Sequence, residues 1–470
     1  MSLSLKFSRC FEAEKLTSRK CVMPEPIISV SGLRGIVGTE LTPLVAVRYV
    51  SAFCTQLPGG AVILSRDGRG TGAMLAAAVS ATLQAHGFEV LDAGICATPT
   101  VGVLVREEKA VGGIQISASH NPIEYNGIKL FNRDGRVIPA EEGEKVRQAY
   151  RAGDTAWKAT KDIGAIFKLA DPHGAHEQLV LKTVDPMAIA ARRFRVLLDS
   201  NHGAGSLLGG RLLESLGVHV QLMGSSPDGK FEHPPEPIAE NLASTSAAVR
   251  TGSFDIGFCQ DPDADRLAII DEHGNYIGEE YTVALCLLEI LSRGRGPIVT
   301  NCATSSMSKA IAASHGVSYH KSAVGEANVV QLMMQQKALF GGEGNGGPID
   351  PRVGWVRDSF VGMALTLSLM ARTGLSVSQL VKRIPYFAMV KNKVTFPVTK
   401  LPEAYQRLVE SMKPDETSTQ DGLRMDWSDR WLLVRGSNTE PIVRLIAEAP
   451  STQDANRLCE DAAAILAKIG

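Results

Sequence analysis

The fold is decided by the apolar stretch AVIL at residues 61–64, the polar loop RDGR at 66–69, and Leu75, Val79 and Leu83 behind them. A continuous apolar run predicts a strand buried on both faces, as in a parallel sheet. Apolar residues four positions apart predict a helix with one buried face. Together the strand, loop and helix predict one unit of an α/β domain.

Two later stretches repeat this order. The second has a strand at 194–198, the loop NHGAG at 201–205 and a helix pattern ending near Gly217. The third has a strand at 297–300 and a helix ending near Gly316. Because the units lie about 100 residues or more apart, they predict three related α/β domains rather than a short-period repeat.

The last part of the chain has a different pattern. Helices are predicted near 403–412 and after a cap at Ser451, with Asp454 in the first turn. Strands are predicted at 394–396, 423–427, 431–434 and 442–447. This order predicts an α+β domain. The predicted division is therefore a disordered tail at 1–23, α/β domains at 24–165, 166–275 and 276–385, and the α+β domain at 386–470.

Composition excludes several classes of protein. The 470 residues are 44% hydrophobic and 21% charged, which is typical of globular chains, and the net charge is −1, from 49 Lys+Arg against 50 Asp+Glu. This balance, with only 6% aromatic residues, argues against nucleic-acid binding and against an anionic-membrane surface. No apolar stretch approaches the roughly 20 residues of a membrane span. We therefore expect neither a nucleic-acid partner nor a membrane partner.

The cysteines and the N-terminus point to a cytoplasmic protein. None of the eight cysteines forms a C-x-x-C pair, so they predict buried thiols in a reducing compartment. Residues 1–23 lack a continuous apolar segment, and Glu12 and Glu14 count against a transit peptide. Met23 is an alternative start, so the sequence does not settle whether residues 1–22 are native.

The sharpest motif is DPDADR at 261–266, between two predicted strands. Three carboxylates this close repel one another unless a cation lies among them, and oxygen ligands of this kind suit Mg²⁺. A solvated acidic turn is the plain alternative. An EF-hand is excluded because Arg266 occupies the position of the obligatory glycine.

Three further motifs carry polar chemistry. SASHNP at 117–122 follows a predicted strand and presents a serine hydroxyl, although alone it is also typical of a structural turn. GEGNGG at 342–347 contains G-x-G-x-x-G, but Pro348 argues against a dinucleotide-binding helix, so hydroxyl recognition or a plain surface loop stays open. RGSNTEP at 435–441 offers the donors that a phosphate needs, or forms an ordinary turn.

Together these motifs resemble the α-D-phosphohexomutase family, which includes phosphoglucomutase/phosphomannomutase and phosphoglucosamine mutase. SGLRG at 31–35, NGIK at 126–129 and the stretch from PDG at 227–229 to ENL at 240–242 also resemble family motifs. The resemblance covers about residues 27–447. It implies three related α/β domains and a C-terminal α+β domain around a central cleft, in agreement with the pattern above.

The resemblance also implies an activity, the interconversion of hexose 6-phosphate and hexose 1-phosphate, and a set of functional residues. It implies phosphorylated Ser119, Mg²⁺ bound by Ser119, Asp261, Asp263 and Asp265, and a hexose 1,6-bisphosphate intermediate. The implied catalytic residues are Arg34, Ser119, His120, Lys129 and Arg266. The implied substrate-binding residues are Glu343, Asn345, Arg435, Ser437, Asn438 and Thr439.

Two points stay open after the resemblance. Many bacterial members have G-E-x-S-G-H in the sugar loop, but this chain has Asn345 in place of Ser and Gly347 in place of His. His120, Lys129 or the substrate itself would then supply the proton transfer, and the preferred hexose and the oligomeric state are not predicted.

An aspartyl-phosphate-type sugar phosphatase and a non-catalytic sugar-phosphate sensor are the alternative functions. Asp265 in the place of Thr or Val argues against the phosphatase.

Overall fold

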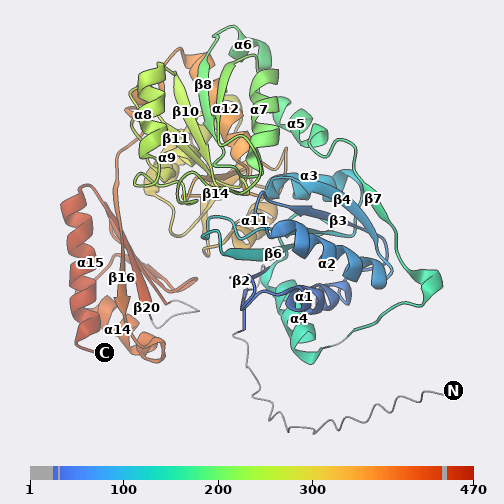
Figure 1. The fold of residues 1–470 in the computed structure, drawn as a ribbon. Coiled ribbons are helices and arrows are strands. Elements are labelled where there is room, and N and C mark those ends of the chain that lie inside the picture. The colour runs from blue at the N-terminus through green and yellow to red at the C-terminus, as the bar shows by residue number, and fades with distance from the viewer. Residues whose placement is uncertain (1–24, 30–31, 154, 437–441, 470) are drawn as a thin grey trace, which may run out of the picture.

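The computed structural model describes residues 25–29, 32–153, 155–436 and 442–469, which form four sheets with their helices (Figure 1). The predicted tail at 1–23, with Cys10 and Cys21, lies outside the described residues. The six described cysteines are free thiols and are buried. Among the described helices, none has both the length and the apolar character to cross a membrane.

The first domain is built on a seven-stranded sheet of order β1-β2-β6-β5-β3-β4-β7. Its strands are β1 (Ile27–Ser29), β2 (Gly32–Ile36), β3 (Ala61–Arg66), β4 (Glu89–Ile95), β5 (Gly112–Ile116), β6 (Tyr125–Asn132) and β7 (Ile166–Lys168). Its helices are α1 (Pro43–Cys54), α2 (Gly72–Ala85), α3 (Thr98–Glu107) and α4 (Ala140–Ala152), with a short 3-10 helix at Thr160–Asp162. Because β7 pairs with β4, this sheet reaches Lys168, just past the predicted boundary at 165.

The second and third domains have four-stranded sheets of order β11-β10-β8-β9 and β13-β12-β14-β15. The second contains α5 (Gly174–Leu181), α6 (Pro186–Ala190), β8 (Arg195–Asp199), α7 (Gly205–Ser215), β9 (His219–Met223), α8 (Ala243–Gly252), β10 (Ile256–Gln260) and β11 (Leu267–Ile270). The third contains α9 (Glu279–Arg293), β12 (Ile298–Asn301), α10 (Ser306–Ser314), β13 (Tyr319–Ser322), α11 (Glu326–Gln336), β14 (Phe340–Glu343), β15 (Gly347–Ile349), α12 (Ser359–Thr373) and α13 (Val377–Val381).

One strand arrangement occurs in all three sheets. The orders β6-β5-β3-β4, β11-β10-β8-β9 and β15-β14-β12-β13 are the same when read in chain order. In each, three strands are parallel and the last one returns antiparallel at the side. The predicted repetition of three α/β units is therefore confirmed, and each unit has an equivalent turn between its third parallel strand and its antiparallel strand.

The fourth domain is an antiparallel sheet of order β16-β20-β19-β18-β17 with two helices, as predicted for an α+β domain. Its elements are β16 (Ala388–Thr395), a 3-10 helix (Val398–Lys400), α14 (Leu401–Met412), β17 (Glu416–Ser418), β18 (Leu423–Asp426), β19 (Trp431–Gly436), β20 (Ile442–Ala449) and α15 (Thr452–Ala467). Strand β16 begins six residues before the predicted 394–396 because residues 388–393, with the polar run KNK at 391–393, also pair with β20. The predicted cap is confirmed, since the Ser451 hydroxyl accepts the Asp454 N–H at 3.1 Å.

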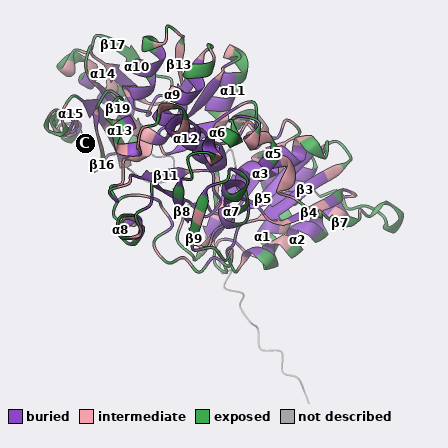
Figure 2. Cartoon of the chain, turned by 90° about the horizontal axis from the view of Figure 1, so that it is seen from above, coloured by how far each residue is buried: buried purple, intermediate pink, exposed green. Residues whose placement is uncertain are grey.

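The apolar cores explain how the domains are held together. The largest cluster of buried apolar side chains runs from the second domain into the third, and α12 packs against both α9 and α6. The fourth domain has its own cluster. Figure 2 shows the buried residues concentrated along the sheets, with exposed residues in the outer helices and loops. The second and third domains are thus one packing unit, and the fourth is attached to it.

Candidate active site

The equivalent turns of the three α/β sheets carry three of the sequence motifs. Ser119 lies in the turn between β5 and β6, the aspartates lie between β10 and β11, and Asn345 lies between β14 and β15. The first two turns meet directly, because the Ser119 hydroxyl donates to Asp261 Oδ2 at 2.8 Å across 142 residues of chain. The predicted convergence of the serine and aspartate motifs is present in the structure.

Ser119 is buried and its backbone is unusual. Its φ is 51°, in the left-handed region that non-glycine residues seldom adopt. The side chain is 1% exposed, and His120 Nδ1 lies 3.3 Å from its oxygen. Burial and the charges of Arg266 and Arg34 lower the pKa of His120 to about 3, so His120 is neutral at physiological pH. A neutral imidazole next to the hydroxyl is able to accept a proton but not to donate one as an imidazolium.

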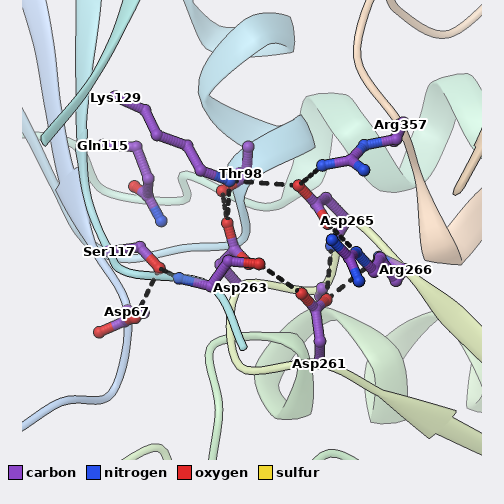
Figure 3. Close-up of polar contacts among 12 residues, drawn as sticks. Asp67, Thr98, Gln115, Ser117, Lys129, Asp261, Asp263, Asp265, Arg266 and Arg357 are labelled. Atoms are coloured by element: carbon purple, nitrogen blue, oxygen red, sulfur yellow. Dashed lines mark hydrogen bonds and ion pairs between the residues drawn. The ribbon is translucent and has the colours of Figure 1, made fainter. Parts of the chain in front are cut away.

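Asp261, Asp263 and Asp265 form a compact set of oxygen ligands (Figure 3). All three are fully buried, and one carboxylate oxygen from each lies within 4.8 Å of the others. Among the described residues, Asp263 Oδ1 and Asp265 Oδ1 are buried without a hydrogen-bond partner. Buried polar atoms are normally satisfied, so these two oxygens fit a ligand role, and carboxylate oxygens suit Mg²⁺. The residues present therefore fit a divalent cation.

Cations compensate the other oxygens of the trio. Lys129 Nζ donates to Asp263 Oδ2 at 2.5 Å and to Asp265 Oδ2 at 3.1 Å, and Arg357 Nη2 donates to Asp265 Oδ2 at 2.6 Å (Figure 3). The Thr98 hydroxyl also donates to Asp263 Oδ2. In both Asp263 and Asp265, Oδ2 thus accepts hydrogen bonds from the protein, whereas Oδ1 accepts none from the described residues.

The pKa values of the three carboxyls are shifted in different directions. Burial, together with the charges of Asp265 and Asp263, raises the pKa of Asp261 well above its ordinary value. Burial acts in the same direction on the other two, but Lys129 and Arg357 hold the pKa values of Asp263 and Asp265 below the ordinary value. A divalent cation among the three would favour the ionised form of Asp261 as well.

The remaining predicted cations surround the serine turn. Arg34 Nη1 donates to Asn121 Oδ1 at 3.1 Å, which places Arg34 on the turn that carries Ser119. Arg266 Nε lies 3.9 Å from Asp265 Oδ1, and Arg266 Nη1 lies 3.9 Å from Glu236 Oε1. Both arginines are therefore close to the serine turn and the aspartates, and they add positive charge there.

Arg357 joins the loop at 342–347, the predicted sugar loop, to Asp265. Arg357 Nη1 donates to Glu343 Oε2 at 2.9 Å, and its Nε donates to Glu326 Oε2 at 3.0 Å. The other oxygen of Glu343 accepts Asn301 Nδ2 at 2.7 Å and the Gly325 N–H at 3.0 Å. Both oxygens of Glu343 are thus engaged, and its predicted contact with sugar hydroxyls stays a prediction.

Asn345 and the fourth-domain loop complete the predicted substrate site. Asn345 Oδ1 is buried and has no hydrogen-bond partner within the described part of the chain. Arg435 Nε donates to Asp421 Oδ1 at 2.7 Å. Ser437, Asn438 and Thr439 lie outside the described residues, so their predicted phosphate contacts are not placed.

Sequence reasoning missed the residues that hold the site together. Arg357, Glu326 and Thr98 contact the predicted residues but belong to none of the motifs. Asp67 and Arg69 were assigned only to a polar loop, yet both are buried against the Ser119 turn. One signal was available for this pair, since RDGR follows the first buried strand at the end of a parallel sheet, where ligands bind.

Comparison with known proteins gives a consistent result. Four family models described as "Phosphoglucomutase/phosphomannomutase" match this chain: α/β/α domain I at residues 26–157, domain II at 177–274, domain III at 279–387 and the C-terminal domain at 389–465. A probable phosphoglucosamine mutase of Methanopyrus kandleri is 33% identical over 436 residues, which are 92% of this chain and 95% of that protein.

Two further proteins are similar over nearly their whole length. A phosphoglucomutase/phosphomannomutase of Thermococcus kodakarensis is 34% identical over 442 residues, covering 91% of this chain and 96% of that protein. The crystal structure of a putative phosphomannomutase from Thermus thermophilus superimposes with a TM-score of 0.80 at 25% identity, covering 94% of this chain and 98% of that chain. These likenesses favour neither of the alternative functions considered from the sequence.

Proposed function

This chain belongs to the phosphoglucomutase/phosphomannomutase family, and we propose that Ser119 is the residue that carries the transferred phosphate. The chain is a phosphohexomutase, an enzyme that interconverts hexose 6-phosphate and hexose 1-phosphate. The observation that carries the proposal is the 2.8 Å contact of the Ser119 hydroxyl with Asp261, in the middle of an acidic trio. This is the arrangement in which a phosphate on the serine would share a cation with the trio.

Asp261, Asp263, Asp265 and an oxygen of phosphorylated Ser119 would hold one Mg²⁺. Bound there, the cation would neutralise negative charge on the group in transfer, which is its usual part in phosphoryl transfer. The side chains of this chain do the rest. Lys129 is kept cationic, because Asp263 and Asp265 raise its pKa despite burial. With Arg34 and Arg266 it provides fixed positive charge where negative charge develops.

The other end of the substrate would be held by the third and fourth domains. Arg435, Ser437, Asn438 and Thr439 offer charge and hydroxyl donors for the phosphate already on the sugar. Glu343 and Asn345 lie in the loop that would contact sugar hydroxyls. Transfer from Ser119 gives a hexose 1,6-bisphosphate, which turns end for end and returns its other phosphate to the serine. The same phosphate-holding loop must then accept both orientations of the sugar.

A glucosamine phosphate, a mannose phosphate and a glucose phosphate are the candidate substrates. The sugar loop of this chain has Asn345 and Gly347 where many bacterial members have Ser and His. The similar proteins carry names of both kinds, phosphoglucosamine mutase and phosphoglucomutase/phosphomannomutase. Comparing turnover of glucosamine 6-phosphate, mannose 1-phosphate and glucose 1-phosphate by the purified chain would identify the preferred sugar.

The serine assignment is tested by Ser119→Ala. Removing the hydroxyl leaves nothing for the phosphate to bond to, so mutase turnover should fall to background while binding of the phosphosugar persists. Phosphorylation of the intact protein, followed by mass spectrometry, should disappear in the same variant. The control is Ser51→Ala on α1, another fully buried serine whose hydroxyl has no partner among the described residues. Normal turnover by Ser119→Ala would refute the assignment.

The metal assignment is tested through stability, independently of activity. A ligand that binds only the folded state stabilises it, by about 2.7 kcal/mol at a hundred times its dissociation constant. Adding Mg²⁺ to metal-free protein should therefore raise the thermal midpoint. Asp263→Asn should remove most of this rise, and Asp461→Asn, an exposed site on α15, should keep it. An equal rise in both variants would place the ion elsewhere.

A further inference from the structure

We infer that Arg69 is a positioning residue for Ser119, and that residues 226–233 of the second domain hold Arg69 in place. The inference rests on the proposed role of Ser119 and adds to it. Arg69 lies between the serine turn and the second domain, is 1% exposed, and has no surface on which a substrate could bind. Its effect on the reaction would therefore pass through the turn that carries Ser119.

One guanidinium binds the whole serine turn. Arg69 Nη2 donates to the carbonyl oxygens of Ser119 and Asn121, both at 2.6 Å. Its Nη1 donates to the carbonyl oxygens of Pro122 at 2.7 Å and Tyr125 at 3.1 Å. The planar fork of an arginine has the donors for four such bonds, and an ammonium group does not have them in this geometry. The turn is thus folded around Arg69.

The Ser119 N–H is held as well, by the Ser117 hydroxyl and, through it, by Asp67. The Ser119 N–H donates to the Ser117 hydroxyl at 2.9 Å, and that hydroxyl donates to Asp67 Oδ2 at 2.7 Å. Asp67 Oδ2 also accepts Arg69 Nε at 3.2 Å. A closed ring of hydrogen bonds therefore fixes both the N–H and the C=O of Ser119. A residue with φ of 51° needs such support, because its left-handed backbone is intrinsically unfavourable.

The second domain closes over Arg69 from the opposite side. The Phe231 ring lies 5.1 Å from the Arg69 guanidinium carbon, within the range of a cation–π contact. Gly229 has φ of 69°, and a Cβ there would lie 2.6 Å from the Gly68 carbonyl oxygen. A Cβ on Gly68 would lie 2.9 Å from the Pro227 carbonyl carbon. The two loops thus touch through their backbones, which only glycines at both positions permit.

This contact has a consequence for the reaction. Ser119 belongs to the first domain, whereas Asp261, only 2.8 Å from its hydroxyl, belongs to the second. The distance between the hydroxyl and the acidic trio therefore depends on how the two domains are set against each other. Arg69 is bonded to the serine turn of the first domain and packs under Phe231 of the second. It therefore fixes the position of Ser119 relative to the second domain. This also gives a role to the PDG motif at 227–229, which the proposed chemistry does not use.

Arg69→Lys tests the inference in the full-length enzyme. Lysine keeps the charge but cannot bind four carbonyl oxygens, so the serine turn should relax and Ser119 should move. A displacement of about 1 Å of a reacting group costs up to about 100-fold in rate, so we expect kcat to fall about 10- to 100-fold. KM for the phosphosugar should change less than about twofold, because no part of Arg69 contacts the substrate. Backbone amide exchange at 119–125 should become faster.

Arg352→Lys is the matched control. Arg352 makes the same local turn, with its N–H and Nε bonded to Asp350 two residues earlier, but it binds no loop carbonyls in the described residues. A cost of losing the local turn between an arginine and the aspartate two residues before it would appear in both variants as a lower thermal midpoint. The fall in kcat at constant KM should appear only in Arg69→Lys. Phe231→Leu should give a smaller fall of the same kind, about two- to tenfold.

The outcomes separate this inference from the proposed role of Ser119. Unchanged kcat in Arg69→Lys, or in Phe231→Leu should the lysine variant fail to fold, overturns the positioning role. A rise in KM without a fall in kcat overturns it too, because that result would indicate a direct contribution to binding. If Ser119→Ala itself remains active, the proposed function fails. If Ser119→Ala is inactive and Arg69→Lys is normal, only the inference fails.

Discussion

At the scale of single residues, the packing around position 347 explains why this chain has glycine where many bacterial members have histidine. A Cβ placed on Gly347 would lie 2.4 Å from Arg357 Cδ and 2.8 Å from its Cγ. The stem of Arg357 thus occupies the space that a side chain at 347 would need. The glycine and the arginine belong together: Arg357 reaches Asp265, Glu343 and Glu326 only because residue 347 has no side chain.

We therefore predict that Gly347→Ala lowers both activity and stability. The added methyl group would push Arg357 off its three carboxylates, and overpacking of this kind costs about 1–3 kcal/mol. We expect kcat/KM to fall about tenfold, with a lower thermal midpoint. Gly354→Ala is the matched control, since a Cβ there meets nothing closer than Arg106 Nη2 at 3.9 Å. Equal effects of the two substitutions would contradict the prediction.

The sequence predicted the motif residues of the site but not their supports. The three aspartates stand in a short pattern whose chemistry is readable without coordinates. Ser119 is identified only through the family resemblance, because its motif alone is also typical of a structural turn. Arg357 is a lone arginine about 90 residues from Asp265, and no local spacing marks it. Its partnership with three carboxylates exists only after the second and third domains pack together. Residues that act by long-range contact leave no pattern in the chain.

At the scale of elements, the motifs converge because the fold repeats. The turns after β5, β10 and β14 are equivalent turns of three copies of one strand order. In each copy, a residue at or just past the end of the first strand bonds to a residue at or just past the end of the third parallel strand. Asp67 accepts the Ser117 hydroxyl, the Ser200 hydroxyl donates to Gln260 Oε1, and Asn301 Nδ2 donates to Glu343 Oε1. Periodicity was enough to predict the three strand–loop–helix units. It did not reveal the first part of β16, which is interrupted by the polar run KNK, or the exposed edge strand β7, because neither has a buried apolar run.

The segment at 225–242 has no regular secondary structure and is held by polar anchors. His233 Nε2 lies 3.1 Å from Asp199 Oδ2, at the end of β8. Burial opposes the charged imidazole, but its hydrogen bond and charge interaction with Asp199 raise the pKa of His233 above its ordinary value. The same pair, acting against burial, lowers the pKa of Asp199. The His233–Asp199 pair thus ties the segment that covers Arg69 to the second sheet.

This pair predicts a pH dependence of stability. A raised folded-state pKa of His233 means that its contribution is complete below an unfolded value of about 6.5 and is lost as the pH rises through the folded value. The thermal midpoints of the unmodified protein and His233→Gln should therefore differ more at pH 6 than at pH 9. We expect His233 to contribute about 0.5 kcal/mol more to the free energy of unfolding at pH 6 than at pH 9, given partial solvent screening. His219→Gln, exposed on β9, serves as the control. A gap independent of pH would show that His233 acts only by its shape.

At the scale of the whole molecule, the fourth domain is joined to the third by polar contacts more than by a shared core. Cys302, Trp431 and Leu433 form a small apolar cluster between them. Lys391 Nζ donates to Glu279 Oε1 at 2.5 Å, and the Val324 N–H donates to Asp421 Oδ2 at 2.9 Å. A cavity of about 240 Å³ remains open at the same interface. Such an interface is weaker than the core shared by the second and third domains.

Glu448 on β20 makes a polar contact across that interface, and we predict that Glu448→Ala loosens the fourth domain. The side chain is 1% exposed. It accepts the Ser306 N–H at the start of α10 at 3.0 and 3.1 Å, and Trp431 Nε1 at 2.6 Å. Removing the carboxylate leaves the buried Trp431 Nε1–H and the part-buried Ser306 N–H without their acceptor, and an unsatisfied buried donor costs about 1–3 kcal/mol. Because Ser306 is the first residue of α10, the Glu448 carboxylate also faces a helix N-terminus, where its negative charge is stabilising.

In Glu448→Ala, limited proteolysis between α13 and β16 should become faster, and the thermal midpoint should fall. Glu410→Ala, exposed on α14, should change neither. Proteolysis at the unmodified rate in Glu448→Ala would mean that the apolar cluster alone holds the fourth domain in place.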